Sequence, residues 1–297
     1  MRLISFLDQG QPRLAALKDG NVYRLDSILD DPQANLMDIL RQGPDALASL
    51  SDKFAQSDLP VDKSLTLESM RFLPPIGRPG KIICLGLNYA DHAAEGGHSR
   101  PEYPSVFLRS ATSLVAHGQN MILPECSEQL DYEAELAVII GTRCKNVPVE
   151  KAQEVIAGYS CFNDGSIRDY QRKTAQWTVG KNFDATGAFG PFFVSVEELP
   201  PAAKGLRIQT RLNGVVMQDA NTSDMLFPVE EAIAILSECM TLEPGDVIVT
   251  GTPAGVGAAR KPPVWMKAND LVEVEIEGIG ILSNTVASQK QHGSQIT

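Results

Sequence analysis

One stretch of the sequence joins three acidic residues to an apolar strand, and it constrains the fold more than any other. Asp131, Glu133 and Glu135 stand at every second position, and residues 136–140 are all apolar. In an extended chain these alternate side chains would share one face. Three like charges at the end of a buried strand repel unless a cation or hydrogen-bond donors compensate for them. The stretch therefore indicates a divalent metal site on a rigid element.

The charge balance limits the kinds of partner. The formal net charge is -11, and Lys and Arg form no dense cluster. Because nucleic-acid-binding proteins neutralise phosphates with such clusters, we expect no nucleic-acid partner. A small anion would instead need a local positive site, such as a metal with a few placed cations.

The chain carries no sign of a membrane protein or a secreted one. It has no run of about 18 apolar residues, and Asp8 and Gln9 interrupt the N-terminus too early for a signal peptide. The five cysteines are odd in number, widely spaced and without a C-x-x-C pair. This usage favours reduced thiols, so we expect a cytoplasmic protein with no membrane partner.

The spacing of turn residues predicts two domains in an α+β, β-rich fold. Residues 1–73 contain short strand patterns followed by two helical segments, 35–41 and 44–55, and we interpret them as a small N-terminal domain that serves packing or a partner. A Pro- and Gly-rich connector at 72–80 marks the boundary. Residues 74–297 hold many short strands and few long helices, including helices expected at 148–157 and 228–240.

A short helical segment after the strand at 81–87 carries a candidate general base. Helical geometry from about Tyr89 would place His92 and Glu95 three apart on one face. A carboxylate that orients a histidine fixes its tautomer and raises its basicity. A surface contact between the two side chains is the other interpretation. Gly96 and Gly97 follow and indicate a segment that moves.

A second strand end supplies a third carboxylate. Asp164 stands where the strand pattern 158–164 gives way to a helical turn, so it can complete a site with the acids of 131–135. Arg168 and Gln171 follow at four and seven positions, which would direct both toward the group that Asp164 holds.

Two further segments could contact a ligand. Lys181 lies among glycines and apolar residues, and an ordinary exposed lysine is the alternative interpretation. The loop 251–257 is rich in glycine but lacks the Lys-Ser/Thr of a P-loop. Its backbone amides and Thr252 could approach a ligand carboxylate.

Five blocks in this order resemble the fumarylacetoacetate hydrolase family over about residues 74–286. They are Gly86-Leu87-Asn88-Tyr89-x-x-His92-x-x-Glu95, Asp131-Tyr132-Glu133-x-Glu135-Leu136, Asn163-Asp164-x-x-x-Arg168-Asp169-x-Gln171, Gly180-Lys181 and Gly251-Thr252-Pro253-x-Gly255-Val256-Gly257. Residues 1–73 resemble the short N-terminal domain of many bacterial members.

The resemblance implies a catalytic domain of mixed β-sheets in a roll or barrel, usually as a homodimer, with one Mg²⁺ or Mn²⁺ per subunit. The metal ligands would be Glu133, Glu135 and Asp164, with Asp131 as a neighbour, and oxygen ligands suit a hard cation. His92 and Glu95 match the base dyad, on a segment that acts as a lid in relatives. The positions matching those that bind or polarise the 2-oxo acid end of the substrate are Lys181, Arg168, Gln171 and Thr252.

One position departs from the family pattern. Many members carry Lys-Pro where this chain has Arg109-Ser110, so a contact of Arg109 with the substrate is expected to be altered. The acyl specificity is expected to depend on residues 96–105 and on side chains near Arg109.

The resemblance implies a metal-dependent hydrolase that cleaves the C-C bond of an acylpyruvate, such as fumarylpyruvate or maleylpyruvate, to pyruvate and a carboxylic acid. The metal would chelate the 2-oxo acid, Lys181 would stabilise the enolate, and His92 would activate water. A role in aromatic compound degradation is the accompanying expectation. The base dyad favours water activation over decarboxylation.

Several alternatives remain open from the sequence. The same site could serve a 2-oxo acid decarboxylase, a 2-hydroxyhepta-2,4-diene-1,7-dioate isomerase or a ureidoglycolate lyase. Lys181 could instead form a Schiff base in a metal-independent lyase. The third possibility is a non-catalytic metal-binding relative.

Overall fold

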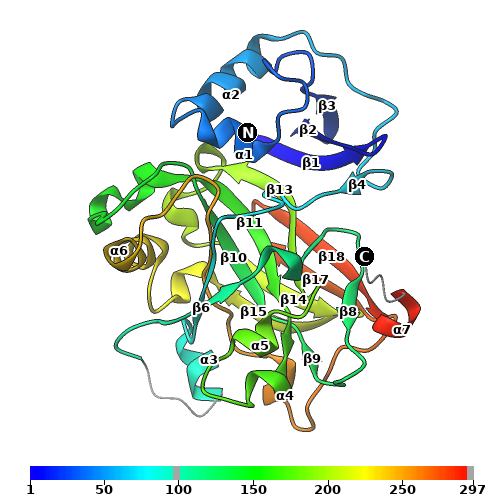
Figure 1. Ribbon diagram of the computed structural model, residues 1–297, viewed down its shortest axis with the longest axis vertical. Coiled ribbons are helices and arrows are strands. Elements are labelled where there is room, and N and C mark those ends of the chain that lie inside the picture. Colours follow the sequence, from blue (N-terminus) through cyan, green and yellow to red (C-terminus); the bar gives the residue numbers. More distant parts are fainter. Residues whose placement is uncertain (96–100, 293–297) are drawn as a thin grey trace.

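A large mixed β-sheet is the main element of the fold. The computed structural model describes residues 1–95 and 101–292, and Figure 1 shows the N-terminal strands at one end of the molecule. The order of this 11-stranded sheet is β3 (Asn21–Arg24), β2 (Gln11–Lys18), β1 (Arg2–Asp8), β13 (Gly187–Ser195), β11 (Ile156–Asp164), β10 (Ala134–Ile140), β16 (Val247–Val249), β5 (Ile82–Gly86) and β6 (Ser105–Arg109). Two short strands pair off this path, β4 (Arg71–Phe72) with β1 and β7 (Leu114–Ala116) with β13.

A second sheet packs against the first and closes the core. Its order is β15 (Val215–Asn221), β14 (Arg207–Leu212), β17 (Leu271–Ile276), β18 (Gly280–Ser288) and β8 (Met121–Leu123). Leu136 and Val138 of β10 join Ile208 and Val274 of this sheet in one apolar cluster. Ala137 on the opposite face of β10 belongs to a second cluster. Strand β10 is therefore buried on both faces, as its unbroken apolar run requires.

The helices are short and lie around the sheets. Those described are α1 (Leu36–Arg41), α2 (Ala46–Gln56), α3 (Ala90–Glu95), α4 (Arg168–Gln171), α5 (Thr178–Lys181), α6 (Val229–Cys239) and α7 (Gln289–His292). The helix predicted at 148–157 is wrong in type and length, because Val149–Val155 form a 3-10 helix and Ile156 already pairs with Ile140 in the sheet. No helix in the described part of the chain is long and apolar enough to cross a membrane.

The predicted β-rich α+β fold is confirmed. Within the described residues, however, neither larger sheet closes into a barrel, because the strand order of each runs from one edge strand to another. The strands expected in residues 1–25 are present, and β1 pairs with β13 through Arg2 and Leu3. The N-terminal strands therefore extend the main sheet, and the division into domains 1–73 and 74–297 stays a prediction.

The acidic strand is interrupted where the carboxylates gather. Asp131 belongs to β9 (Leu130–Asp131), which pairs with β12 (Ser166–Ile167) in a separate two-stranded sheet. Tyr132 and Glu133 lie between β9 and the start of β10. The expectation of one continuous strand from Asp131 is therefore wrong, since the chain changes its pairing partner at this point.

Candidate active site

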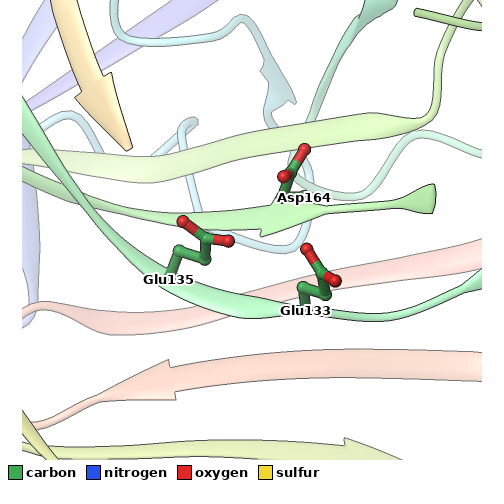
Figure 2. Close-up of side chains that lie close together, drawn as sticks. All are labelled: Glu133, Glu135 and Asp164. Carbon is green, nitrogen blue, oxygen red and sulfur yellow. The ribbon is translucent and has the colours of Figure 1, made fainter. Parts of the chain in front are cut away.

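Three buried carboxylates meet where β10 and β11 run side by side. Glu133 immediately precedes β10, Glu135 lies within it, and Asp164 is the last residue of β11. The antiparallel register pairs Ala134 with Asn163, and the Asp164 amide donates to the Glu133 carbonyl at 2.9 Å. Each side chain offers an oxygen within 4.8 Å of the others. Figure 2 shows the three carboxylates close together. The register of two strands thus builds the cluster that the sequence predicts from separate segments.

Buried cations contact two of these carboxylates. The Lys181 ammonium lies 2.6 Å from both Glu133 and Asp164, and Arg168 lies 2.7 Å from Glu133. Lys181 is only 2% exposed, so its interpretation as an ordinary exposed lysine is wrong. It is the last residue of α5, which packs against α4.

The cations make the carboxylates unequal. Burial alone would raise the pKa of Glu133, but Lys181 and Arg168 outweigh it and lower that pKa to about 2. Burial raises the pKa of Glu135 well above its ordinary value, and the neighbouring Asp164 and Glu133 raise it further. Burial would lower the pKa of Lys181, but Asp164 and Glu133 raise it, so the ammonium stays charged.

The cluster fits a hard divalent cation. All three donors are carboxylate oxygens, they converge from two rigid strands, and all are buried. The described salt bridges give Glu135 no cationic partner, although the Gly251 amide donates to it at 2.5 Å. A divalent ion would supply the positive charge that this carboxylate lacks.

Asp131 is not part of the carboxylate cluster and instead contacts backbone amides and Arg168. It accepts hydrogen bonds from the amides of Gly257 and Ala258 at 2.8 and 3.0 Å, and from Arg168 at 2.8 Å. Gly257 approaches so closely that a β-carbon there would lie 2.6 Å from the Asp131 carboxylate. Asp131 therefore links β9, α4 and the glycine loop.

The predicted dyad is formed on α3. His92 Nδ1 lies 2.8 Å from Glu95 Oε1, and the other oxygen of Glu95 accepts a hydrogen bond from the Gly255 amide at 2.9 Å. The second bond attaches α3 to the glycine loop. Residues 96–100, which belong to the predicted mobile and specificity-determining segment, lie outside the described residues.

One cavity of about 430 Å³ is lined by nine of the ten residues to which the sequence assigns a ligand, catalytic or substrate-binding role. They are His92, Glu95, Glu133, Glu135, Asp164, Arg168, Gln171, Lys181 and Thr252. Gln171 accepts a hydrogen bond from Arg168 at 2.9 Å, and the hydroxyl of Thr252 accepts one from Gln218 at 2.8 Å. The tenth residue, Arg109, does not line the cavity, so its predicted contact with the substrate receives no support.

Sequence reasoning missed several residues of the site. Asn163 accepts a hydrogen bond from the Glu133 amide at 3.0 Å, and Gln218 of β15 accepts one from the Ala134 amide at 3.0 Å. Asn163 stands next to Asp164, which was a usable signal, whereas nothing near Gln218 in the sequence points to the site. An apolar wall also went unnoticed, formed by Leu85, Leu87, Phe107, Trp177 and Val256.

The fold and the cavity define a strand-rich α+β protein with a buried oxygen-ligand site beside a histidine–carboxylate pair. Residues 81–287 match the family model described as the fumarylacetoacetate (FAA) hydrolase C-terminal domain. The chain belongs to the fumarylacetoacetate hydrolase family.

Named relatives carry out more than one reaction. The chain is 39% identical to the mitochondrial oxaloacetate tautomerase FAHD2A of Bos taurus over 295 residues, which cover 96% of this chain and 91% of the relative. A fumarylacetoacetate hydrolase structure from Exiguobacterium antarcticum is 34% identical with a TM-score of 0.82, covering 97% of this chain and all of that one. The structure of maleylpyruvate hydrolase from Sphingobium sp. SYK-6 with manganese(II) and pyruvate is 27% identical with a TM-score of 0.80, covering 97% and 99% of the two chains.

Proposed function

We propose that this protein is a divalent-metal-dependent enzyme that forms the enolate of a small 2-oxo acid, and that its reaction is the keto–enol tautomerisation of oxaloacetate. One cavity contains the carboxylate cluster, the Lys181 ammonium and the His92–Glu95 pair, which are the groups that enolate chemistry needs. Oxaloacetate is chosen because the tautomerase from Bos taurus is similar to this chain over nearly its whole length.

Glu133, Glu135 and Asp164 would hold Mg²⁺ or Mn²⁺. The bound ion would polarise the 2-oxo group and neutralise negative charge on its oxygen. The manganese(II) in the maleylpyruvate hydrolase structure is consistent with this ion type.

The side chains of this chain would move the proton. His92, held by Glu95, would take a proton from the carbon next to the 2-oxo group and would return that proton to the enolate oxygen to give the enol. Lys181 is fully charged between two carboxylates and would stabilise the oxygen as charge develops on it. The buried Thr252 and the partly exposed Gln171 would orient the substrate carboxylate.

Arg172 supports a substrate with a second carboxylate. It follows α4, lines the cavity and forms no ion pair with any described residue, whereas Arg168, Lys181 and His92 each have an acidic partner. A carboxylate at the far end of the substrate would supply that partner. The substrate class is therefore proposed to be the 2-oxo dicarboxylic acids.

This role of Arg172 predicts a selective loss of affinity. Arg172→Ala should raise the KM for oxaloacetate about five- to tenfold, which is the range for an exposed charge-assisted contact. Oxalate resembles only the 2-oxo acid end of oxaloacetate and does not extend to Arg172. Its inhibition constant should therefore be unchanged. Lys173→Ala is the matched control, because Lys173 stacks 3.3 Å above the Tyr170 ring and does not line the cavity. An equal change for oxaloacetate and oxalate would remove Arg172 from substrate recognition.

Hydrolysis of an acylpyruvate is the second candidate. The maleylpyruvate hydrolase structure holds pyruvate, a product of such cleavage, and the same His92 could take a proton from an attacking water. Fumarylpyruvate and maleylpyruvate, and with them a role in aromatic compound degradation, belong to this candidate.

The Schiff-base alternative is disfavoured by the environment of Lys181. A nucleophilic lysine must be neutral, but Asp164 and Glu133 raise the pKa of this ammonium. Borohydride treatment with pyruvate after chelation should therefore leave the protein unmodified.

Direct measurement of the reaction tests the proposal. The enol and keto forms of oxaloacetate are followed by NMR with metal-free protein and after addition of Mg²⁺ or Mn²⁺, beside fumarylpyruvate, maleylpyruvate and acetylpyruvate. We expect metal-dependent tautomerisation that chelation abolishes. Release of pyruvate from an acylpyruvate without tautomerisation would establish the hydrolase instead, and loss of carbon dioxide from oxaloacetate the decarboxylase. No turnover of any of these compounds would favour a non-catalytic relative.

A further inference from the structure

Arg109 contacts the carboxylate cluster without lining the cavity. It is the last residue of β6, its side chain is completely buried, and it does not line the cavity. Its guanidinium contacts Asp164, one of the three clustered carboxylates. The substrate-binding role expected from the sequence therefore has no geometric basis, and another role is needed to explain a buried cation.

Every nitrogen of the guanidinium has a partner. Nη1 donates to Asp164 Oδ1 and, at 3.1 Å, to the Gly165 carbonyl. Nε donates to Ser113 Oγ at 3.1 Å, and Nη2 donates to Thr186 Oγ1 at 2.9 Å. These partners lie on three separate segments of the chain. The partners other than Asp164 thus hold the planar guanidinium in position beside that carboxylate.

The space around the guanidinium is also closed. A β-carbon on Gly187 would lie 2.7 Å from Arg109 Nη2, and the Phe162 ring centroid lies 5.9 Å from Arg109 Cζ. Gly187 has no unusual backbone conformation, so the close approach of Arg109 is the reason that a larger residue would not fit.

The two oxygens of Asp164 have different partners. Arg109 holds Oδ1, while Lys181 lies 2.6 Å from Oδ2 on the cavity side. We propose that Arg109 is a positioning residue that fixes the rotation of the Asp164 carboxylate, so that Oδ2 faces the metal site. Partners of this kind orient metal ligands, and their loss weakens metal binding about 10- to 100-fold.

Metal titration tests this role without any substrate, so the outcome is independent of the proposed function. The dissociation constant of Mn²⁺ is measured by calorimetry for the wild-type protein and for Arg109→Met, which keeps much of the side-chain volume. We expect binding to weaken about 10- to 100-fold. The EPR spectrum of bound Mn²⁺ should also change, because the ligand geometry is altered.

Two control variants separate positioning from packing. Ser113→Ala and Thr186→Val each remove one partner of Arg109 but leave its contact with Asp164. They should lower the melting temperature without weakening Mn²⁺ binding more than about threefold. If they weaken it as much as Arg109→Met does, the role is packing and the proposal fails. A folded Arg109→Met protein with wild-type affinity would overturn it as well.

A further variant decides the question if Arg109→Met does not fold. Arg109→Lys keeps the charge but lacks the planar fork that reaches Ser113, Thr186 and Asp164 together. Its affinity for Mn²⁺ should be lower than that of the wild type, by up to about a hundredfold. The EPR spectrum of the bound Mn²⁺ should also change. An unchanged affinity together with an unchanged spectrum would show that the guanidinium does not position Asp164.

Discussion

His92 pairs with Glu95 one helical turn away, and it is the residue to which the proposed reaction assigns proton transfer. Residues three apart on a helix are neighbours, so the pairing with Glu95 could be expected from the sequence, and the structure has it at 2.8 Å. The burial of Lys181 could not be expected in this way. It depends on the pairing of β10 with β11, which brings Glu133 and Asp164 to one place from segments far apart in the chain.

The His92→Ala variant should lower turnover about 10²- to 10⁴-fold, the usual contribution of a general base. Its affinity for Mn²⁺ should change little, because His92 is not among the three carboxylate ligands proposed. Steady-state kinetics with oxaloacetate and a metal titration measure the two quantities. Glu95→Gln, which keeps the size of the partner, should give a smaller loss. Turnover that persists in His92→Ala would remove the dyad from the mechanism.

Helices α4 and α5 are each a single turn, and their mutual packing positions several groups of the cavity. Arg168 and Gln171 belong to α4, and Lys181 ends α5. Gly180 is where the two helices meet, since a β-carbon there would lie 2.3 Å from the Gln171 backbone nitrogen. The sequence predicted a helical turn at Arg168 and Gln171 but none at Lys181, and it could not predict the contact of the two helices, because short helices of this kind are held by tertiary packing.

Gly180→Ala should therefore lower the free energy of unfolding by about 1–3 kcal/mol, the usual cost of overpacking. The clash is with backbone, which cannot rotate away. Denaturant unfolding measures the effect. Gly77→Ala is the matched control, because nothing lies within 4 Å of a β-carbon at that position. Equal stability of the two variants would contradict the assigned contact.

At the scale of the whole molecule, the N-terminal strands and the second sheet meet near His117. The His117 ring stacks edge-on against Phe72 of β4, with ring centroids 4.7 Å apart, and its Nδ1 accepts a hydrogen bond from the Ser283 amide of β18 at 3.0 Å. Because a protonated ring nitrogen cannot accept this bond, the neutral form is the one that the fold holds. The predicted homodimer and cytoplasmic location stay predictions at this scale.

Burial lowers the pKa of His117 below its ordinary value. The unfolded chain then binds a proton more readily than the folded one, so the stabilising effect is complete above about pH 6.5 and is lost as the pH falls below it. His117→Asn should show a smaller drop in melting temperature between about pH 7.5 and about pH 5.5 than the wild type. Calorimetry of metal-free protein at both values measures this, and identical pH dependence would contradict it.

Pairing between distant segments accounts for what the sequence did not reveal about the whole molecule. The apolar run of β10 and the turn residues of the N-terminal strands were sufficient to predict those elements. The change of partner at Tyr132 and Glu133 was not visible, because it depends on β12 and on the Asn163 side chain. Arg109 was assigned to the substrate for the same reason, since only the folded sheet brings it into contact with Asp164.

The two oxygens of Glu95 connect the orientation of His92 to the attachment of α3. One lies against the imidazole of His92, and the other accepts a hydrogen bond from the Gly255 amide of the loop 251–257. When α3 leaves that loop, the carboxylate loses its anchor and the imidazole loses its fixed orientation. The orientation of the proposed base would therefore depend on the attachment of α3. In the proposed reaction, His92 would then transfer a proton only while α3 is attached to the loop, so the enolate would form with the base already in place.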